Sequence, residues 1–551
     1  MLSDIEIAQS AKLKRIDDLA HEWGLEDNEF EPYGWDKAKL TLNPERKADA
    51  KLILVTATSG MPAGSGKTTT SIALAQALNR LGKKAVLALR CKCFRSRCRF
   101  PDRKSGAAGG GYSQVLPMES VNLHFTGDFH AITAANNLIS ALIDNARHQR
   151  QIDLKEVTWR RVLDVNDRQL RNIVTGLGGS ANGTPSEAGF DITAASELMA
   201  VLCLATDLDD LRARIDRLVL GIKRDGSAFT CAELGATGSV MALLLDAMKP
   251  NLVQTLEGTP ALVHGGPFAN IAHGCNSVVA TLAAMKLGEY AITEAGFGSD
   301  LGAEKFYDIK CRHAGLRPAA VVLVTSLKAL KWHGGVALPE IGKPNMEALK
   351  AGLCNLDAHV ANLKAFGPEI VVSMNHFYND PEDEIAVLRA RCEELGVRFA
   401  ISDGFAKGGE GAESVAKEVL EAAAASKGEL HFTVEDEDPI AVKVEKIAKR
   451  VYGAGSVSFS EAAKKDLKTL TDMGFGNLPV CIAKTPFSLT ADPKALGAPK
   501  GFDLPVQRVI LNAGAGFAVV TTGAIMRMPG LPKAPAAMNI DVKNGKITGL
   551  A

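Results

Sequence analysis

The sequence predicts an α/β protein: a P-loop nucleotide domain on a parallel sheet, a second α/β lobe, and a small C-terminal α+β domain. Three observations lead to this fold class. Apolar, strand-like runs alternate with segments of helical period along most of the chain. Several of those runs end directly in polar, glycine-rich turns, as strands do at the ligand-binding edge of an open parallel sheet. At 551 residues the chain is also too long for one core.

We expect three domains. Residues 1–350 form the nucleotide domain, and residues 351–455 repeat the helix and strand pattern as a second lobe. Residues 456–551 mix short strands with Gly/Pro turns, which is typical of a small α+β domain.

The nucleotide domain starts from a phosphate-binding loop. Residues 52–56 form an apolar, β-branched strand, and a turn rich in small residues follows at 59–66. A helical pattern runs over 71–81, and residues 85–89 form the next strand. In such a unit the turn amides and the helix N-terminus bind phosphate, Lys67 reaches the terminal phosphates, and Thr68 offers its hydroxyl to a metal ion. The residues expected to bind the nucleotide are Met61, Pro62, Ala63, Gly64, Ser65, Gly66, Lys67 and Thr68.

The loop departs from the standard Gly-x4-Gly-Lys-[Ser/Thr] pattern. That pattern needs glycine at position 61, where Met61 stands, and Gly60 comes one residue early. The alternative is an ordinary turn between a strand and a helix. Because strand and helix flank the turn as the mechanism requires, we favour the phosphate site.

Three polar residues near strand ends are candidates for chemistry. Arg90 closes the strand at 85–89 and would lie beside the loop, suited to a bidentate grip on a carboxylate or an acyl phosphate. The alternative is a surface arginine. Asp128 and His130, predicted to end another strand, could face the same crevice as a metal-facing acid or as proton-transfer groups, or could be a structural cap.

Two aromatic residues follow predicted strands of the second lobe. Phe377 and Phe405 could sandwich a flat heterocycle between their rings, with core packing as the alternative.

Composition excludes several classes of protein. There are 63 basic and 63 acidic residues and only 5% aromatics, so neither a nucleic-acid face nor a membrane span is expected. The acidic N-terminus argues against secretion, and ten scattered cysteines fit reduced thiols, which together predict a cytoplasmic protein. His264 and His273, and the cysteines at 91, 93 and 98, have no standard zinc spacing.

Longer stretches resemble one family closely, the formate–tetrahydrofolate ligases (10-formyltetrahydrofolate synthetases) of the monofunctional bacterial type. The resemblance runs from residue 5 to residue 550. The matching stretches are residues 62–70, 106–112, 122–132, 252–260, 264–277, 293–298, 406–411 and 528–533.

The resemblance implies that ATP, formate and tetrahydrofolate give 10-formyltetrahydrofolate, ADP and phosphate through formyl phosphate. It implies that Lys67 and Thr68 hold the ATP phosphates and Mg²⁺, and that Arg90 grips formate and then formyl phosphate. The candidates for catalytic residues are Lys67, Arg90 and Asp128. The pterin would stack between Phe377 and Phe405. Members are typically homotetramers aided by K⁺ or NH₄⁺.

The chain departs from the family pattern in four places. Ser65 replaces Glu, Phe405 replaces Trp, Ser186 replaces Arg, and residues 91–105 replace a segment that begins Glu-Pro-Ser-Leu-Gly-Pro. We interpret the last as a local reading-frame error, because the pattern resumes at residue 106. If the segment is genuine, a carboxylate is missing at Cys91. The alternatives to an active ligase are therefore a catalytically impaired homologue and a P-loop nucleotide switch.

Overall fold

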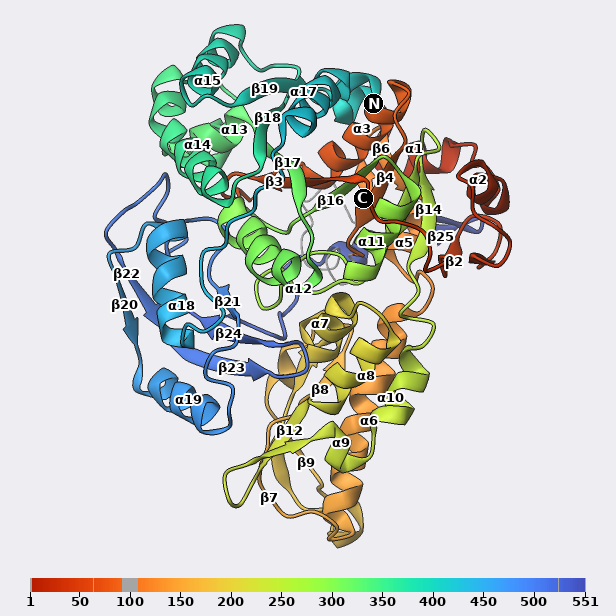
Figure 1. Ribbon diagram of the computed structural model, residues 1–551, viewed down its shortest axis with the longest axis vertical. Helices are drawn as coiled ribbons and strands as arrows, with labels where there is room; N and C mark the ends of the chain where they lie inside the picture. The colour runs from red at the N-terminus through yellow and green to blue at the C-terminus, as the bar shows by residue number, and fades with distance from the viewer. Residues whose placement is uncertain (1, 63, 92–107, 524, 551) are drawn as a thin grey trace.

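The computed structural model describes residues 2–62, 64–91, 108–523 and 525–550. One large sheet organises the upper half of the molecule in Figure 1. From β15 to β19 every pairing is parallel, and β14 pairs antiparallel with both β15 and β2. The strands in sheet order are β1 (Phe30–Pro32), β2 (Ala38–Leu40), β14 (Asn251–Thr255), β15 (Pro260–Val263), β4 (Ala85–Leu89), β16 (Tyr290–Glu294), β3 (Lys51–Ala57), β17 (Pro318–Thr325), β18 (Glu369–Asn375) and β19 (Arg398–Ser402).

Helices cover both faces of this sheet. Alternate residues of β3 belong to opposite cores, with Leu52 and Leu54 in one and Ile53 and Val55 in the other. Both faces are buried, which explains why these strands read as continuous apolar runs. One face carries α3 (Lys67–Arg80) and α17 (Glu413–Ala425). The other carries α11 (Val278–Leu287), α13 (Leu327–His333), α14 (Met346–Phe366) and α15 (Glu382–Glu394).

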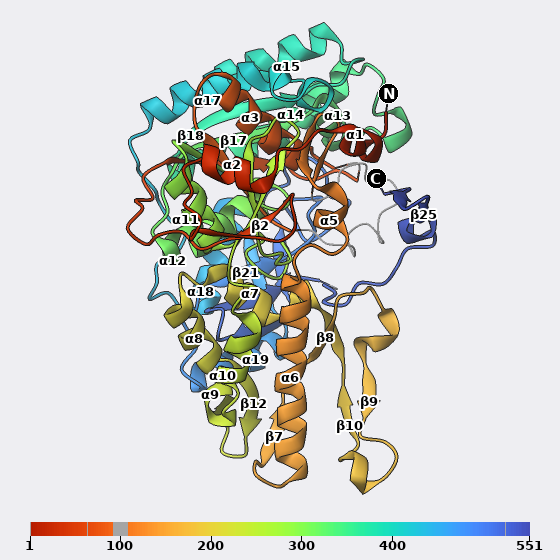
Figure 2. The ribbon, with the colours of Figure 1, turned by 90° about the vertical axis from the view of Figure 1, so that its right-hand side faces the viewer.

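A second group of elements has its own hydrophobic core and lies below the sheet in Figure 1. Its helices are α6 (Asp128–His148), α7 (Glu197–Leu204), α8 (Leu208–Asp216), α9 (Cys231–Leu234) and α10 (Thr237–Leu244). Its strands are β7 (Leu154–Val157), β8 (Arg161–Leu163), β11 (Phe190–Ile192), β12 (Val219–Lys223) and β13 (Ala228–Thr230). A hairpin of β9 (Ile173–Thr175) and β10 (Ser186–Ala188) extends beside α6 in Figure 2. The sequence did not indicate this part as a separate unit.

A third group lies at the C-terminal side of the chain. It comprises α18 (Ile440–Ile447), β20 (Ser456–Phe459), α19 (Glu461–Asp472), β21 (Val480–Ala483), β22 (Asp503–Val506), β23 (Arg508–Asn512) and β24 (Phe517–Thr521). The last hairpin, β25 (Asp541–Lys543) with β26 (Lys546–Thr548), returns to α1 (Asp4–Ser10), where Gln9 donates to the carbonyl of Ile547 at 3.1 Å. The two ends of the chain therefore meet.

The α/β fold class and its mostly parallel sheet are confirmed. The expected boundary between residues 350 and 351 falls inside α14, and β18 and β19 continue the sheet of the nucleotide domain. The sheet therefore extends past residue 350, where a second lobe was expected. The sequence analysis did not show this, because local sequence patterns do not reveal which strands are neighbours.

The prediction that Asp128 ends a strand is wrong. Val121, Leu123 and Phe125 alternate with polar residues as in a strand, but the chain forms α5 (Met118–Asn122) and a short loop there. Gly127, with φ of 95°, then starts α6 at Asp128. Along the described residues, no helix combines the length and the apolar character that crossing a bilayer requires.

Candidate active site

The phosphate loop leaves β3 at the middle of the sheet and enters α3. Gly66 caps α3 with φ of 78°, a left-handed conformation that favours glycine. A Cβ at this position would lie 2.6 Å from Nδ2 of Asn375, at the end of β18. Among the described residues no side chain caps α3. A helix N-terminus that follows a glycine-rich turn is the kind of place where proteins bind phosphate.

The described residues of the predicted loop connect the end of β3 to the start of α3. Met61 is buried and packs on Ala329 and Ile341. Gly60 precedes it, and a Cβ there would meet the carbonyl oxygen of Pro486 at 3.0 Å. The glycine one residue early is therefore explained by a close approach, while Met61 anchors the loop. Ala63 lies outside the described residues.

Lys67 and Thr68 begin α3 and both make polar contacts. The ammonium of Lys67 donates to Oγ of Ser65 at 2.9 Å. The hydroxyl of Thr68 donates to Oε2 of Glu294 at 2.7 Å. A hydroxyl and a carboxylate are hard oxygen ligands of the kind that Mg²⁺ prefers beside substrate phosphates.

Glu294, which contacts Thr68, is a candidate site residue that the sequence analysis did not single out. It ends β16, is buried, and lies between the ends of β3 and β4 in the sheet. The available signal was a carboxylate at the last position of a predicted strand, followed by a glycine-rich turn. Nothing local pairs it with Thr68, which is 226 residues away in the chain.

Arg90 follows β4. We expected β4 to lie next to β3, the strand that leads into the phosphate loop, but these two strands are not neighbours. The strand β16 lies between them, so two strand spacings, about 10 Å, separate their backbones. Nη1 of Arg90 donates to the carbonyl of Pro267 at 2.7 Å. On the other side, a Cβ at Gly296 would lie 3.5 Å from Nη2. The guanidinium thus lies over the turn that follows Glu294.

Asp128 lies in a different setting from the one predicted. Its carboxylate pairs with Nζ of the buried Lys39 at 2.5 Å and accepts from Nδ2 of Asn251 at 2.7 Å. Together with Cys91, His130 and Asp164, it lines a cavity of about 280 Å³. Cys91, one of the residues that line this cavity, directly follows Arg90 in the chain. Residues 92–105, which carry most of the unusual segment and two of the cysteines considered above, lie outside the described residues.

Phe377 and Phe405 follow β18 and β19, whose ends pair at Asn375 and Ser402. The ammonium of Lys328 lies 3.6 Å from the centroid of the Phe377 ring. Phe405 is 36% exposed, and its carbonyl accepts from the amide of Tyr112 at 2.9 Å. Among the described residues the two rings make no direct ring contact with each other.

Two ionisable groups border the Phe377 ring. Asp380 accepts from the amide of Phe377 at 2.9 Å, and burial raises the pKa of its carboxyl. Burial likewise lowers the pKa of Lys328. The phosphate loop, Arg90 and the two rings follow the carboxyl ends of β3, β4, β18 and β19, which are parallel strands of one sheet. All of them therefore lie at the same edge of that sheet.

Comparison with known proteins gives one consistent result. A sequence model of the family described as formate–tetrahydrofolate ligase matches residues 2–551. A formate–tetrahydrofolate ligase of Bacteroides fragilis is 53% identical over 562 residues, which cover 100% of both chains. Those of Porphyromonas gingivalis and Bacteroides thetaiotaomicron are 53% and 52% identical, again over 100% of both chains.

Proposed function

This chain belongs to the formate–tetrahydrofolate ligase family, and from that premise we propose that it joins formate to tetrahydrofolate at the expense of ATP. The products are 10-formyltetrahydrofolate, ADP and phosphate. The observation that carries the proposal is the full-length match, which takes in the phosphate loop, Arg90 and both rings.

The reaction needs two displacements. A formate oxygen attacks the γ-phosphorus of ATP, and ADP leaves, giving formyl phosphate. N10 of the folate then attacks the formyl carbon, phosphate leaves, and N10 loses its proton. Lys67 and the first amides of α3 hold the ATP phosphates, while Arg90 neutralises charge that develops on the transferred phosphoryl group.

The remaining roles follow from the same edge of the sheet. Mg²⁺, which neutralises phosphate charge when it is bound, would be held by Thr68 and Glu294, whose oxygens suit it. The pterin stacks on Phe377 and Phe405, and the Asp128 carboxylate faces the reacting groups from its cavity. We also propose activation by K⁺ or NH₄⁺ and a homotetramer.

The test is formation of 10-formyltetrahydrofolate from formate, MgATP and tetrahydrofolate, read after acid conversion to the absorbing methenyl form. Product that requires all three substrates supports the ligase. Absence of product with nucleotide binding intact contradicts it and points to an impaired homologue, because Cys91 stands where the family has Glu. Rates in K⁺ and Na⁺ salts, and light scattering on the purified protein, test the cation and the tetramer.

A further inference from the structure

Ser59, the second residue after β3, is buried and has every polar atom bonded to another part of the chain. Its amide donates to Oδ1 of Asn355 at 3.2 Å. Its hydroxyl oxygen accepts from Nδ2 of Asn355 at 3.1 Å and lies 2.9 Å from Nε2 of His359. Its carbonyl oxygen lies 3.3 Å from Nε2 of His333. Three side chains from α13 and α14 thus converge on one residue of the loop.

The hydrogen-bond partners fix the proton position on His333. The amide of Gly497 donates to Nδ1 of His333 at 3.2 Å, so the proton of His333 is on Nε2 and points to the Ser59 carbonyl. The ring of His359 bridges two hydroxyls, with Nε2 2.9 Å from Oγ of Ser59 and Nδ1 2.6 Å from Oγ of Ser299. In the neutral imidazole one of these nitrogens donates and the other accepts. Asn355 is oriented by its second bond, to the Gly497 carbonyl at 2.8 Å.

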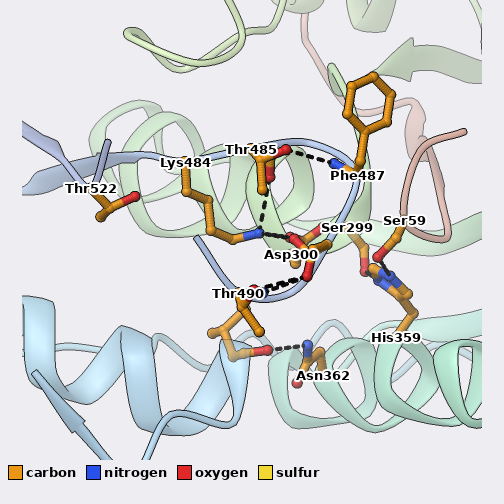
Figure 3. A network of polar contacts seen from close by, with 12 residues as sticks. Ser59, Ser299, Asp300, His359, Asn362, Lys484, Thr485, Phe487, Thr490 and Thr522 are labelled. Carbon is orange, nitrogen blue, oxygen red and sulfur yellow. Dashed lines mark hydrogen bonds and ion pairs between the residues drawn. The ribbon is translucent and has the colours of Figure 1, made fainter. Parts of the chain in front are cut away.

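The segment that follows β21 adds further contacts at the loop entrance, and Figure 3 shows its Lys484 at Asp300, beside the contacts of Ser299, His359 and Ser59. The amide of Gly60 donates to the carbonyl of Pro486 at 3.0 Å. Lys484 holds this segment, because its ammonium bonds Asp300 at 2.7 Å and the Ser488 carbonyl at 2.5 Å. Asp300 adjoins Ser299, which contacts His359. The Lys484–Asp300 pair is almost completely buried.

Such a network is costly unless it is fully satisfied, and apolar residues would fill the same space more cheaply. Here the hydrogen bonds of the network are made to Ser59 and Gly60, the residues where the phosphate loop begins. The amides of that loop must already point at the phosphates for tight binding, because ordering them on binding would cost affinity. Fixing the backbone at the start of the loop should therefore raise the affinity for ATP.

We propose that His333, Asn355 and His359 are positioning residues that hold the phosphate loop in its nucleotide-binding conformation by clamping Ser59. The inference rests on the proposed function, since it assumes that this loop binds ATP. It concerns residues that touch no substrate and act through the loop backbone alone.

Two replacements of His359 separate positioning from packing. In H359Q the side-chain amide reaches the place of Nε2 and keeps a hydrogen bond to Ser59, as donor or as acceptor. In H359N the shorter amide keeps only the Ser299 side. We expect H359N to raise KM for ATP and Kd for MgADP about tenfold, the loss expected for one or two hydrogen bonds, whereas H359Q stays within about twofold of wild type. KM for formate and for tetrahydrofolate should not change in either variant.

N355A tests the same clamp from another residue if the His359 variants do not fold, and it should also raise Kd for MgADP about tenfold. The matched control is N362A on the same helix, because Asn362 bonds the Val451 carbonyl at 2.7 Å, outside the contacts that the described residues make with Ser59. N362A should lower Tm without changing Kd for MgADP. Equal MgADP affinity in H359N, N355A and wild type overturns the clamp, and so does a wild type that binds no nucleotide. Tight MgADP binding without ligation contradicts the proposed function and leaves the clamp standing.

Discussion

The phosphate loop and the ring pair lie at the same edge of one sheet but are built differently. The loop is made of backbone, with glycines at left-handed φ and a buried clamp at its entrance. The ring pair is made of side chains, of which Phe405 is exposed and Phe377 carries the Lys328 ammonium on its ring. One site is held from several directions, and the other depends on the identity of two residues.

This difference leads us to expect unequal effects from the departures from the family pattern. At Ser65 the proposed binding groups are backbone amides, and the side chain accepts a hydrogen bond from Lys67. Met61 takes a position normally given to glycine without disturbing the loop, because it points into a small apolar cluster. At Phe405, in contrast, we expect the ring, smaller than the tryptophan usual in the family, to offer less area for the proposed stacking of the pterin. A backbone site tolerates side-chain change, and a side-chain site does not.

The largest effect should come from adding a methyl group to the loop backbone. G66A places a Cβ 2.6 Å from Asn375 at a φ of 78°, so both a clash and backbone strain oppose it. We expect kcat/KM for ATP to fall about 100-fold or more, which corresponds to roughly 3 kcal/mol. Steady-state kinetics with varied ATP measures it.

The matched control is G64A, which has φ of 87° but nothing within 4 Å of the added Cβ. It carries the strain alone and should cost about 10-fold. Equal losses in G64A and G66A would show that strain, and not the Asn375 contact, sets the loop.

The second prediction concerns the pair formed by Thr68 and Glu294. E294Q keeps the shape but removes the charge that faces Mg²⁺, so the Mg²⁺ concentration giving half-maximal rate should rise about 10-fold. The control is E289Q, at an exposed glutamate directly before the same strand, and it should not change this Mg²⁺ concentration. An unchanged Mg²⁺ requirement in E294Q would place the metal elsewhere.

The third prediction is acid sensitivity of the loop clamp. Burial lowers the pKa of His359 to about 4, against about 6.5 when unfolded. A depressed pKa means that His359 stabilises the fold fully above pH 6.5, and that this contribution is lost as the pH falls towards 4. At pH 5 the loss is about 2 kcal/mol, so H359Q should flatten the dependence of unfolding free energy on pH between 6.5 and 4.5. Parallel curves for H359Q and wild type would contradict the assignment.

The sequence predicts what is local and misses what only the fold brings together. The loop, its glycines and the strand ends follow from patterns of ten to twenty residues, so residues 59–68 and Arg90 could be placed near phosphate chemistry. Glu294 could not be paired with Thr68, because their strands become neighbours only in the sheet. The clamp on Ser59 joins β3, α13, α14 and the segment around Pro486, and no periodicity reports such a meeting. Asp128 was misplaced because an alternating apolar run there forms a helix and a loop.

The smallest effect tests the side-chain site and has the opposite sign to the others. F405W enlarges an exposed ring that has room to grow, so we expect KM for tetrahydrofolate to fall about two- to fivefold through added stacking area. F377W enlarges a half-buried ring whose face is already covered by Lys328, so it should raise that KM instead. KM for ATP should not change in either variant, since the loop is held independently of both rings. If the two replacements act alike, the rings do not bind the pterin as an asymmetric pair, and the contrast between a backbone site and a side-chain site fails at this edge.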